Sequence, residues 1–320
     1  MLNNTEPNGR AEYMEDRTTP ASPRHGDPLV SAIMTTHNRE PDMVLRAVYS
    51  VLNQTHQNME LIVVDDSLPS FARRAEVEQS VRSVSDDILY LKHEVCQGPC
   101  AARNTGLRHA KGTYVGFLDD DDEWMPTKVE EQLRGFHDEN TALVYSQIIY
   151  VKEESHTERL GSPRSESGYL FEKLLRFNFI GPTSGPLIKK ECIDAVGGFD
   201  VLMESSQDYD LWLRLAMKYP IQYIDIPLLR CHIHSGKRIM TDDEKRIRGV
   251  ERILSKYAEY FNADRNAWYS RGIILMPHYL NVFGRKKALA LWFSCVKKCP
   301  EKISYNFKLL ATIIIGHEQS

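Results

Sequence analysis

The sequence predicts an α/β fold with a mainly parallel sheet, followed by a helical C-terminal region. From Pro28 onward, short apolar segments alternate with amphipathic ones, which is the pattern of β-α-β units. Polar residues, many of them acidic, follow the predicted strands, and open α/β sheets bind ligands at the carboxyl ends of their strands. We therefore expect three parts: a disordered tail over 1–27, an α/β domain over 28–240 and a helical region over 241–320.

The individual elements follow from the same patterns. Predicted strands cover residues 29–34, 60–64, 88–91, 114–118, 142–151 and 186–189. Predicted helices begin at Pro41 and behind the second strand, and cover 101–110, 127–137, 191–196 and 208–219. The inward face of the first helix is predicted to be Val44, Leu45, Val48, Val51 and Leu52. The polar stretch 153–166 is expected to be a mobile loop.

Composition excludes several classes of protein. The 320-residue chain has a net charge of −4 and a pI near 6.3, so no overall basic field would gather nucleic acid. Its six cysteines form no CxxC pair and no zinc spacing, which favours reduced thiols and a cytoplasmic protein. The longest late apolar stretch, 309–315, is far shorter than the ~20 residues that span a bilayer, so no transmembrane helix is expected.

Four consecutive aspartates, Asp119 to Asp122, follow the predicted strand 114–118. Like charges on neighbouring residues repel one another, and a divalent cation with hard oxygen ligands relieves that repulsion. The acidic run therefore predicts a Mn²⁺ or Mg²⁺ site at the edge of the sheet. The alternative is a solvated acidic turn without a ligand.

Five blocks of the sequence, in order, resemble glycosyltransferase family 2, the inverting nucleotide-sugar transferases with a GT-A fold. The blocks are residues 30–39 (VSAIMTTHNR), 63–67 (VVDDS), 98–107 (GPCAARNTGL), 117–124 (FLDDDDEW) and 207–215 (QDYDLWLRL). The resemblance covers about 29–235. It implies a Rossmann-like GT-A catalytic domain that moves a sugar from a nucleotide-sugar donor, expected to be a UDP-sugar, to an acceptor hydroxyl.

The resemblance also implies donor-binding residues at the strand ends. Thr35 and His37 would flank the nucleobase, with Arg39 on the same loop. The family usually has Tyr where His37 stands. Asp66 would accept a hydrogen bond from the base, while the neighbouring Asp65 shapes the turn.

Arg103 and Asn104 begin a helix near the expected diphosphate, where a guanidinium and helix amides suit an anion. Helix capping is the competing role, above all for Asn104. The resemblance identifies Asp119 and Asp120 as donor-binding.

Metal-binding and catalytic residues are implied in the same way. Asp121 closes the DxD motif and is the expected direct metal ligand, with Asp122 beside it and His232 near the same diphosphate. Asp208 is the expected catalytic base. Because Asp208 also begins a helix, capping is its competing role. Gln207 stands where family members often carry Glu.

Two other functions remain open at this point. A sugar nucleotidyltransferase also uses a nucleotide-binding sheet and a metal, but its glycine-rich phosphate loop is not seen near the N-terminus. A nucleotide- or glycan-binding module without turnover is the non-enzymatic alternative. The acceptor is expected to be a glycan or a lipid-linked sugar.

The C-terminal region interleaves lysines with apolar residues: Lys286, Lys287, Lys297, Lys298 and Lys302 with Leu289, Leu291, Trp292, Phe293 and Val296. This pattern suits peripheral contact with an anionic membrane surface, expected at the inner face of the membrane. The alternative is a helical bundle that packs on the catalytic domain.

Overall fold

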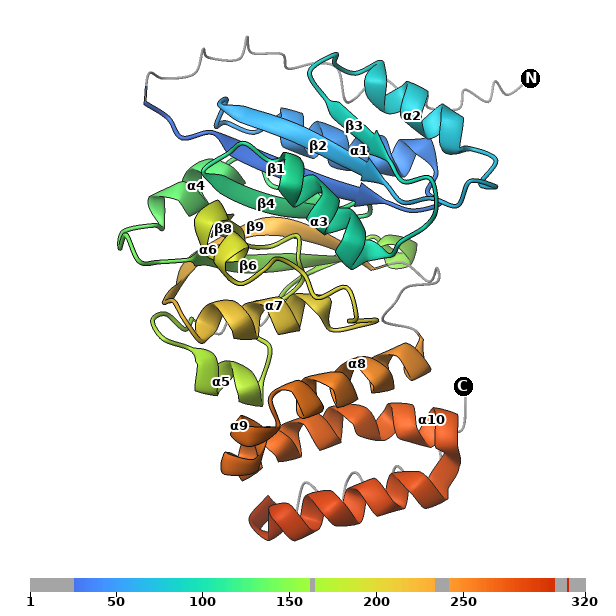
Figure 1. The fold of residues 1–320 in the computed structure, drawn as a ribbon, viewed down its shortest axis with the longest axis vertical. Coiled ribbons are helices and arrows are strands. Elements are labelled where there is room, and N and C mark those ends of the chain that lie inside the picture. Colours follow the sequence, from blue (N-terminus) through green and yellow to red (C-terminus); the bar gives the residue numbers. More distant parts are fainter. Residues whose placement is uncertain (1–25, 162–164, 234–241, 303–309, 311–320) are drawn as a thin grey trace, which may run out of the picture.

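The computed structural model describes residues 26–161, 165–233, 242–302 and 310 (Figure 1). Its strands are β1 (Val30–Thr36), β2 (Met59–Asp65), β3 (Leu89–Lys92), β4 (Tyr114–Asp119), β5 (Glu123–Trp124), β6 (Leu143–Lys152), β7 (Thr157–Leu160), β8 (Leu187–Lys189) and β9 (Ile221–Ile233). They form one sheet with the order β3-β2-β1-β4-β8-β6-β9-β5, and β7 pairs with β6. The predicted tail lies almost wholly outside the described residues.

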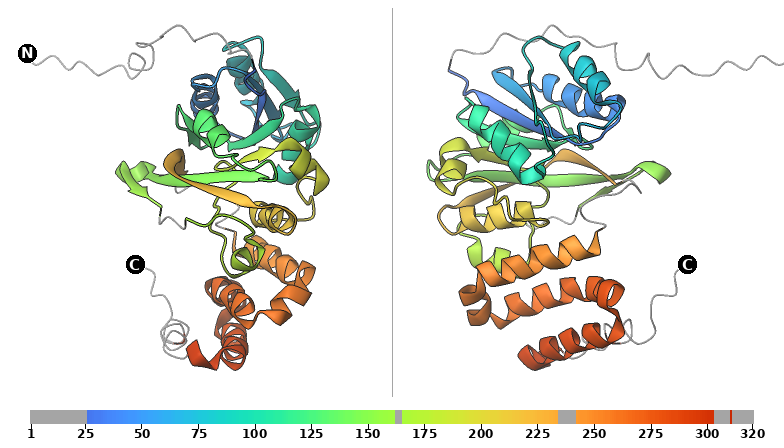
Figure 2. Two further views of the ribbon diagram at one scale, coloured as in Figure 1. Left: turned by 90° about the vertical axis from the view of Figure 1, so that its left-hand side faces the viewer. Right: turned by 45° about the vertical axis from the view of Figure 1, so that its right-hand side comes forward.

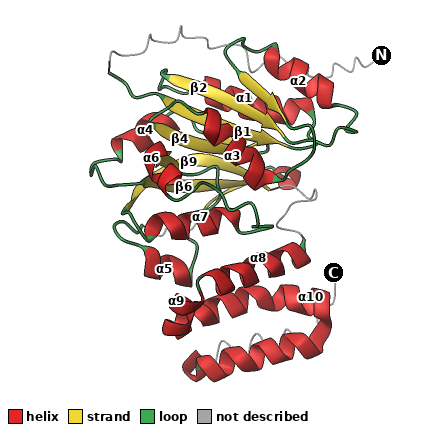
Figure 3. Ribbon diagram, in the orientation of Figure 1, coloured by secondary structure: helices red, strands yellow, loops and turns green. Residues whose placement is uncertain are grey.

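The helices are α1 (Pro41–Leu52), α2 (Arg74–Arg82), α3 (Pro99–His109), α4 (Lys128–Arg134), α5 (Phe171–Arg176), α6 (Lys190–Ala195), α7 (Gln207–Ala216), α8 (Asp243–Lys256), α9 (Ala258–Ala263) and α10 (Arg265–Lys298). Two 3₁₀ turns are η1 (Glu153–Ser155) and η3 (Pro300–Lys302). The side chains of α1 and α2 share one core with one face of β1 and β2. Those of α3, α6 and α7 share a second core with the opposite face, so the sheet lies between two helical layers (Figure 3).

The first half of the sheet is parallel, as predicted. β1 pairs in parallel with both β2 and β4, and β2 pairs in parallel with β3. Most side chains of β1, β2 and β4 are buried on both faces of the sheet, which explains their continuous apolar sequence. The edge strand β3 is partly exposed, with Leu89 40% exposed. Because the strands run in one direction, their carboxyl ends meet at a single edge.

The second half of the sheet is mixed. β8 pairs antiparallel with β4 and with β6, while β9 lies parallel to β6. The 13-residue strand β9 was not predicted, because Pro227 interrupts its pattern and proline is rare inside strands. The structure accommodates Pro227 at an irregularity opposite Gln147, where the register shifts.

Two further details correct the sequence interpretation. The stretch 153–166 is not simply a loop, since η1 leads into β7, which forms an antiparallel hairpin with β6. On α1, Leu52 is 40% exposed, and Pro41 and Ala47 are buried in addition to the three valines.

The C-terminal helices form successive layers beyond α7 (Figure 2). Within α10, Gly284 has φ 74° and ψ 178°, a conformation open mainly to glycine, and it breaks the helix into two halves that fold back on each other (Figure 1). Most of the predicted membrane stripe packs inside this hairpin, including Leu289, Leu291 and Trp292, whereas Phe293 is 64% exposed. No helix among the described residues is both long and apolar enough to cross a membrane.

Candidate active site

The carboxyl ends of β1, β2 and β4 bring the predicted donor residues together. Thr35 is level with Asp119 in the register of β1 and β4, and Thr36 is level with Asp65 in β1 and β2. The sequence blocks that follow these strands therefore surround one edge of the sheet, which is the outcome that parallel pairing dictates.

Two arginines contact the acidic run from different elements. Arg39, on the loop after β1, donates from Nε to Asp120 at 2.8 Å and from Nη2 to Asp121 at 3.0 Å. Arg103, on α3, donates to the carboxylate of Asp119 at 2.6 Å and is almost fully buried. The run is thus partly neutralised by the protein itself.

The charges of the acidic run nevertheless remain crowded. Burial raises the pKa of Asp120 to about 6, against the opposing effect of Arg39. Burial, followed by the like charges of Asp121 and Asp119, raises the pKa of Asp122 to about 8. Crowded carboxylates favour a hard divalent cation, the class of ion predicted from sequence, but among the described residues no three of these four aspartates have ligand atoms within 4.8 Å of one another.

Asp208 lies within electrostatic reach of the same acids. It is half-buried at the first turn of α7, and burial raises its pKa, with Arg103 acting to lower the value and Asp119 to raise it. One carboxylate oxygen accepts a hydrogen bond from the Tyr209 backbone N–H at 2.8 Å, so a local capping contact is also present. The structure therefore brings Asp208, Arg103 and Asp119 together from three separate sequence blocks.

Asp65 and Asp66 perform different tasks at the end of β2. Asp65 accepts the Ser67 backbone N–H at 2.8 Å and Arg74 Nε at 2.8 Å, a turn-shaping arrangement that matches its expected role. Asp66 is buried, and its two oxygens accept the backbone N–H groups of Gln97 and Gly98 at 2.7 and 2.8 Å. Asp66 thus orders the loop that leads into α3.

His37 is exposed beside this loop. Its Nδ1 lies 2.8 Å from the Asp66 carbonyl oxygen and 3.8 Å from Cys96 Sγ. Within the described ranges, His37, Asp66 and Cys96 are the three side chains whose ligand atoms converge, all within 4.8 Å. Because a carbonyl partner makes His37 Nδ1 the donor, this nitrogen is not presented as a metal ligand.

Two predicted residues are engaged elsewhere. Asn104 exchanges two hydrogen bonds of 2.8 Å with the backbone of Phe199, which clamps the segment after α6 to α3. The ring of His232 lies between two glutamates, with Nε2 at 2.6 Å from Glu123 and Nδ1 at 3.2 Å from Glu153. The backbone N–H of His232 donates to Asp122 of the acidic run at 3.2 Å.

The acidic run is supported by a set of contacts that the sequence did not predict. The Ser184 hydroxyl accepts the Asp119 N–H at 3.1 Å, and the Ser184 carbonyl accepts the Trp124 indole at 3.0 Å. Lys128, fully buried, lies 4.1 Å from the centre of the Trp124 ring and donates to Gln132 at 2.7 Å. Trp124 belongs to a recognised sequence block and Lys128 lies four residues after it, but nothing in the sequence links either residue to Ser184.

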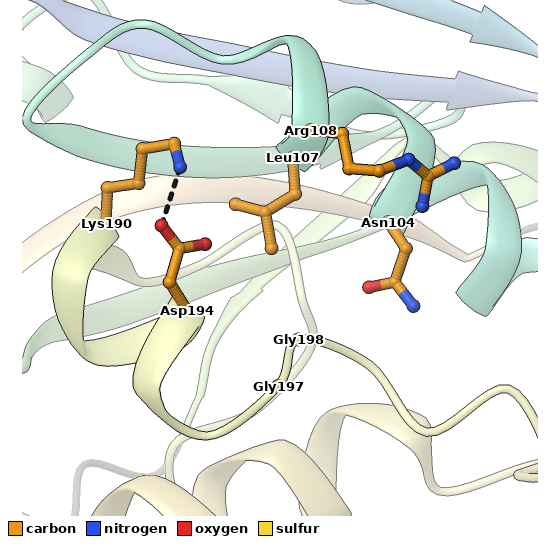
Figure 4. A pocket seen from close by; sticks show the side chains of 7 residues that line it. All are labelled: Asn104, Leu107, Arg108, Lys190, Asp194, Gly197 and Gly198. Atoms are coloured by element: carbon orange, nitrogen blue, oxygen red, sulfur yellow. Dashed lines mark hydrogen bonds and ion pairs between the residues drawn. The ribbon is translucent and has the colours of Figure 1, made fainter.

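A cavity of about 340 Å³ lies between α3 and α6 (Figure 4). Its lining includes Asn104, Arg108, Lys190 and Asp194, and Lys190 and Asp194 form an ion pair of 2.6 Å. None of the four aspartates lines it, so this cavity is separate from the chemistry described above.

Comparison with known families decides the class of protein. Residues 31–197, just over half of the chain, match the model for glycosyl transferase family 2. The chain belongs to glycosyltransferase family 2. This glycosyltransferase is 29% identical over 242 residues to the putative colanic acid biosynthesis glycosyl transferase WcaA of Escherichia coli K12, covering 74% of this chain and 84% of that protein. It is 31% identical over 189 residues to the E. coli UDP-Glc:alpha-D-GlcNAc-diphosphoundecaprenol beta-1,3-glucosyltransferase WfgD, covering 59% and 70%.

Solved structures share the fold of this glycosyltransferase. S. aureus TarS 1–349 in complex with UDP-GlcNAc aligns with a TM-score of 0.59 at 16% identity, covering 87% of this chain and 83% of that chain. The mannosyltransferase PcManGT from Pyrobaculum calidifontis, in complex with GDP-Man and Mn²⁺, aligns with a TM-score of 0.55 at 19% identity, covering 94% and 83%. Against a longer TarS chain, this chain spans 50% of the length. The fold is therefore GT-A, as predicted.

Proposed function

We propose that this glycosyltransferase moves a sugar from a nucleotide-sugar donor, a UDP-sugar, to the hydroxyl of a glycan or lipid-linked acceptor, with a divalent metal and with inversion at the anomeric carbon. The observation that carries the proposal is the position of Asp208, a half-buried carboxylate with a raised pKa, beside the pair formed by Arg103 and Asp119. This reaction needs a base, a cationic side chain that binds the diphosphate, and acidic residues that hold a metal. Asp208, Arg103 and the acidic run are the candidates for these three roles.

The donor would lie along the ends of β1, β2 and β4. Thr35 and His37 flank the expected nucleobase position, and Asp66 acts by ordering the loop before α3 as well as by facing the base. Arg103 is suited to the diphosphate, since its guanidinium is already held by Asp119. Asn104, occupied by Phe199, is reassigned to a structural role.

Asp121 and Asp122 would hold the metal ion, with Asp119 and Asp120 completing the acidic run. A bound Mn²⁺ or Mg²⁺ supplies Lewis-acid catalysis and neutralises charge on the departing nucleoside diphosphate. Arg39 balances part of the negative charge when it pairs with Asp120 and Asp121. His232 supports the site through its backbone contact with Asp122 and its ion pair with Glu123.

Asp208 would remove the proton from the acceptor hydroxyl, which then attacks the anomeric carbon from the side opposite the leaving diphosphate. A single in-line displacement inverts the configuration at that carbon. The raised pKa of Asp208 brings the carboxylate closer to the strength that a base needs near neutral pH.

Support for the acceptor class comes from relatives. Two of them are named as glucosyltransferases that use UDP-Glc and a diphosphoundecaprenol-linked acceptor, and another is named for colanic acid biosynthesis. We extend this to a role in polysaccharide biosynthesis on a lipid-linked sugar. The lysines around α10 and the exposed Phe293 would then meet the membrane surface on which such an acceptor lies.

A panel of nucleotide sugars in a thermal-shift assay, with and without Mn²⁺, tests the proposal. A donor that binds only the folded protein raises its melting temperature by mass action, and we expect the shift for one UDP-sugar to require Mn²⁺. Asp121→Asn should lose the Mn²⁺-dependent part. If no nucleotide sugar raises the melting temperature under either condition, donor binding at this edge is refuted.

A further inference from the structure

Three basic residues on one face of α8 contact the segment 200–210, which contains Asp208. Arg248 donates to Glu204 at 2.9 Å, and Arg252 donates to Asp200 at 3.1 Å. Lys256 contacts Asp200 at 3.0 Å and the fully buried Asp210 at 2.7 Å. Because these residues are four apart on a helix, they form one row along the segment.

The backbones of α8 and this segment are also in close contact. A Cβ atom added at Gly249 would lie 2.7 Å from the carbonyl oxygen of Ser205 and 2.9 Å from its carbonyl carbon. Side-chain rearrangement cannot relieve contacts with backbone atoms, so any larger residue would push Ser205 away. Glycine at 249 is what allows α8 to approach the residues just before Asp208.

The two residues that follow Asp208 in the chain both contact the C-terminal helical region. The guanidinium of Arg271, on α10, lies over the ring of Tyr209, with its Cζ atom 4.8 Å from the ring centre. The carboxylate of Asp210 accepts the Tyr257 hydroxyl at 2.9 Å. The base candidate is thus followed by two residues whose side chains contact the part of the chain beyond residue 242.

The first turn of α7 lacks a capping hydrogen bond from its N-cap side chain. Ser206 adopts a left-handed conformation with φ 58° and ψ 30°, and in the described structure its side chain makes no capping hydrogen bond. A non-glycine residue in this region carries strain and persists only where the surroundings impose it. The contacts of α8 with Glu204 and Ser205 hold the residues directly before Ser206 and so supply such surroundings.

We propose that the C-terminal helices are positioning elements for the catalytic base, with Gly249 and Arg252 of α8 as the positioning residues that set where Asp208 lies. This inference rests on the proposed role of Asp208 as the base. It assigns the helical region a part in turnover that donor binding does not need, because the contacts described above join α8 and α10 to the base segment.

The first test is Gly249→Ala, measured as kcat for transfer, KM for the donor and Kd for the nucleoside diphosphate. A displacement of about 1 Å at a catalytic group can cost ~10²-fold in rate, so we expect kcat to fall by about 10- to 100-fold with donor KM and nucleotide Kd unchanged. The matched control is Gly112→Ala, whose Cβ would meet the Ser31 backbone N at 2.6 Å, at the opposite ends of the strands. That variant should lose melting temperature but keep the kcat of the folded enzyme.

The second test covers the case in which Gly249→Ala does not fold. Arg252→Gln removes a partly exposed ion pair and should lower kcat by about 2- to 5-fold, with rescue by Arg252→Lys. Arg265→Gln is its control, because Arg265 pairs with Glu301 at 3.3 Å, and both residues lie in the C-terminal region.

Two results are distinguishable. If folded Gly249→Ala, or Arg252→Gln in its place, keeps wild-type kcat while Asp208→Asn loses turnover, the positioning role is overturned and the proposed function stands. If Asp208→Asn keeps wild-type turnover, Asp208 is not the base, and this part of the proposed function is refuted independently of the α8 variants.

Discussion

Aspartates occur in two parts of this glycosyltransferase with opposite electrostatics. In the acidic run, burial and like charges raise the pKa of Asp120 to about 6 and of Asp122 to about 8. In the segment before α7, the pKa of Asp200 is lowered to about 2, because hydrogen bonds from Lys256, the Leu202 backbone N–H and Arg252 outweigh the effect of burial. The negative charge of the aspartates is therefore only partly neutralised in the acidic run at the strand ends. Where α8 contacts the segment before α7, lysine and arginine side chains neutralise it.

The difference separates chemistry from architecture. Where carboxylates contact lysines or arginines, as Asp200 and Asp210 contact Lys256, the pairs join α8 to α7 and to the segment before it and leave little charge for a ligand. Where carboxylates crowd one another, an added cation gains from their repulsion. The same reasoning predicts which substitutions should reduce activity and which should reduce stability.

The largest effect is expected from Asp121→Asn. Loss of a metal ligand removes several kcal/mol of transition-state stabilisation, so transfer should fall by about 10³-fold, while the melting temperature stays near that of the wild type. The control is Asp86→Asn, at an exposed aspartate outside the site. Normal transfer by Asp121→Asn, or undiminished transfer by the wild type in excess chelator, would contradict the comparison.

Asp210→Asn should act on stability instead. Asp210 is fully buried between Arg214 at 2.8 Å and Lys256 at 2.7 Å, and removal of one partner from a buried ion pair costs about 3 kcal/mol. Urea unfolding measures the loss. A variant as stable as the wild type would mean that these ion pairs do not hold α8 to α7.

The sequence predicted the acidic run at the strand ends. It did not predict the contacts between α8 and the segment before α7. Asp121 and Asp208 were identified because each belongs to a short block with a local pattern. The partners of Asn104 and His232 lie far along the chain, at Phe199 and Glu123, separations of 95 and 109 residues. No periodicity specifies such contacts, since they depend on how β9 and the segment after α6 pack against the first half.

The pH dependence of turnover sharpens the role of Asp208. Burial raises its pKa above that of an ordinary aspartate, and a base works only when deprotonated, so kcat should fall as the pH decreases through this raised value. Arg103 opposes the shift, so Arg103→Gln should move the acidic limb of the kcat profile to higher pH. A limb that stays at the wild-type position in Arg103→Gln would separate the kinetic base from Asp208.

The smallest effect concerns Lys128. Burial lowers its pKa to about 7, so the unfolded chain binds more protons than the folded one between about pH 7 and the ordinary lysine pKa. Lys128 therefore makes stability rise with pH across that range, and Lys128→Met should flatten the rise in melting temperature. Lys111→Met, at an exposed lysine, is the control. An unchanged slope in Lys128→Met would show that the buried ammonium keeps its proton.

The central claim is tested most directly by release of nucleoside diphosphate from the donor that the thermal-shift panel identifies, in the presence of its acceptor, for wild type and Asp208→Asn. An amide has the size of the carboxylate and its oxygen still accepts the Tyr209 N–H, but it cannot take the proton of the acceptor. We predict Mn²⁺-dependent release by the wild type and a loss of ~10²- to 10⁴-fold in Asp208→Asn, with unchanged melting temperature and donor affinity. Near-normal turnover by Asp208→Asn would contradict the account. So would nucleoside diphosphate release by the wild type at the same rate with and without Mn²⁺.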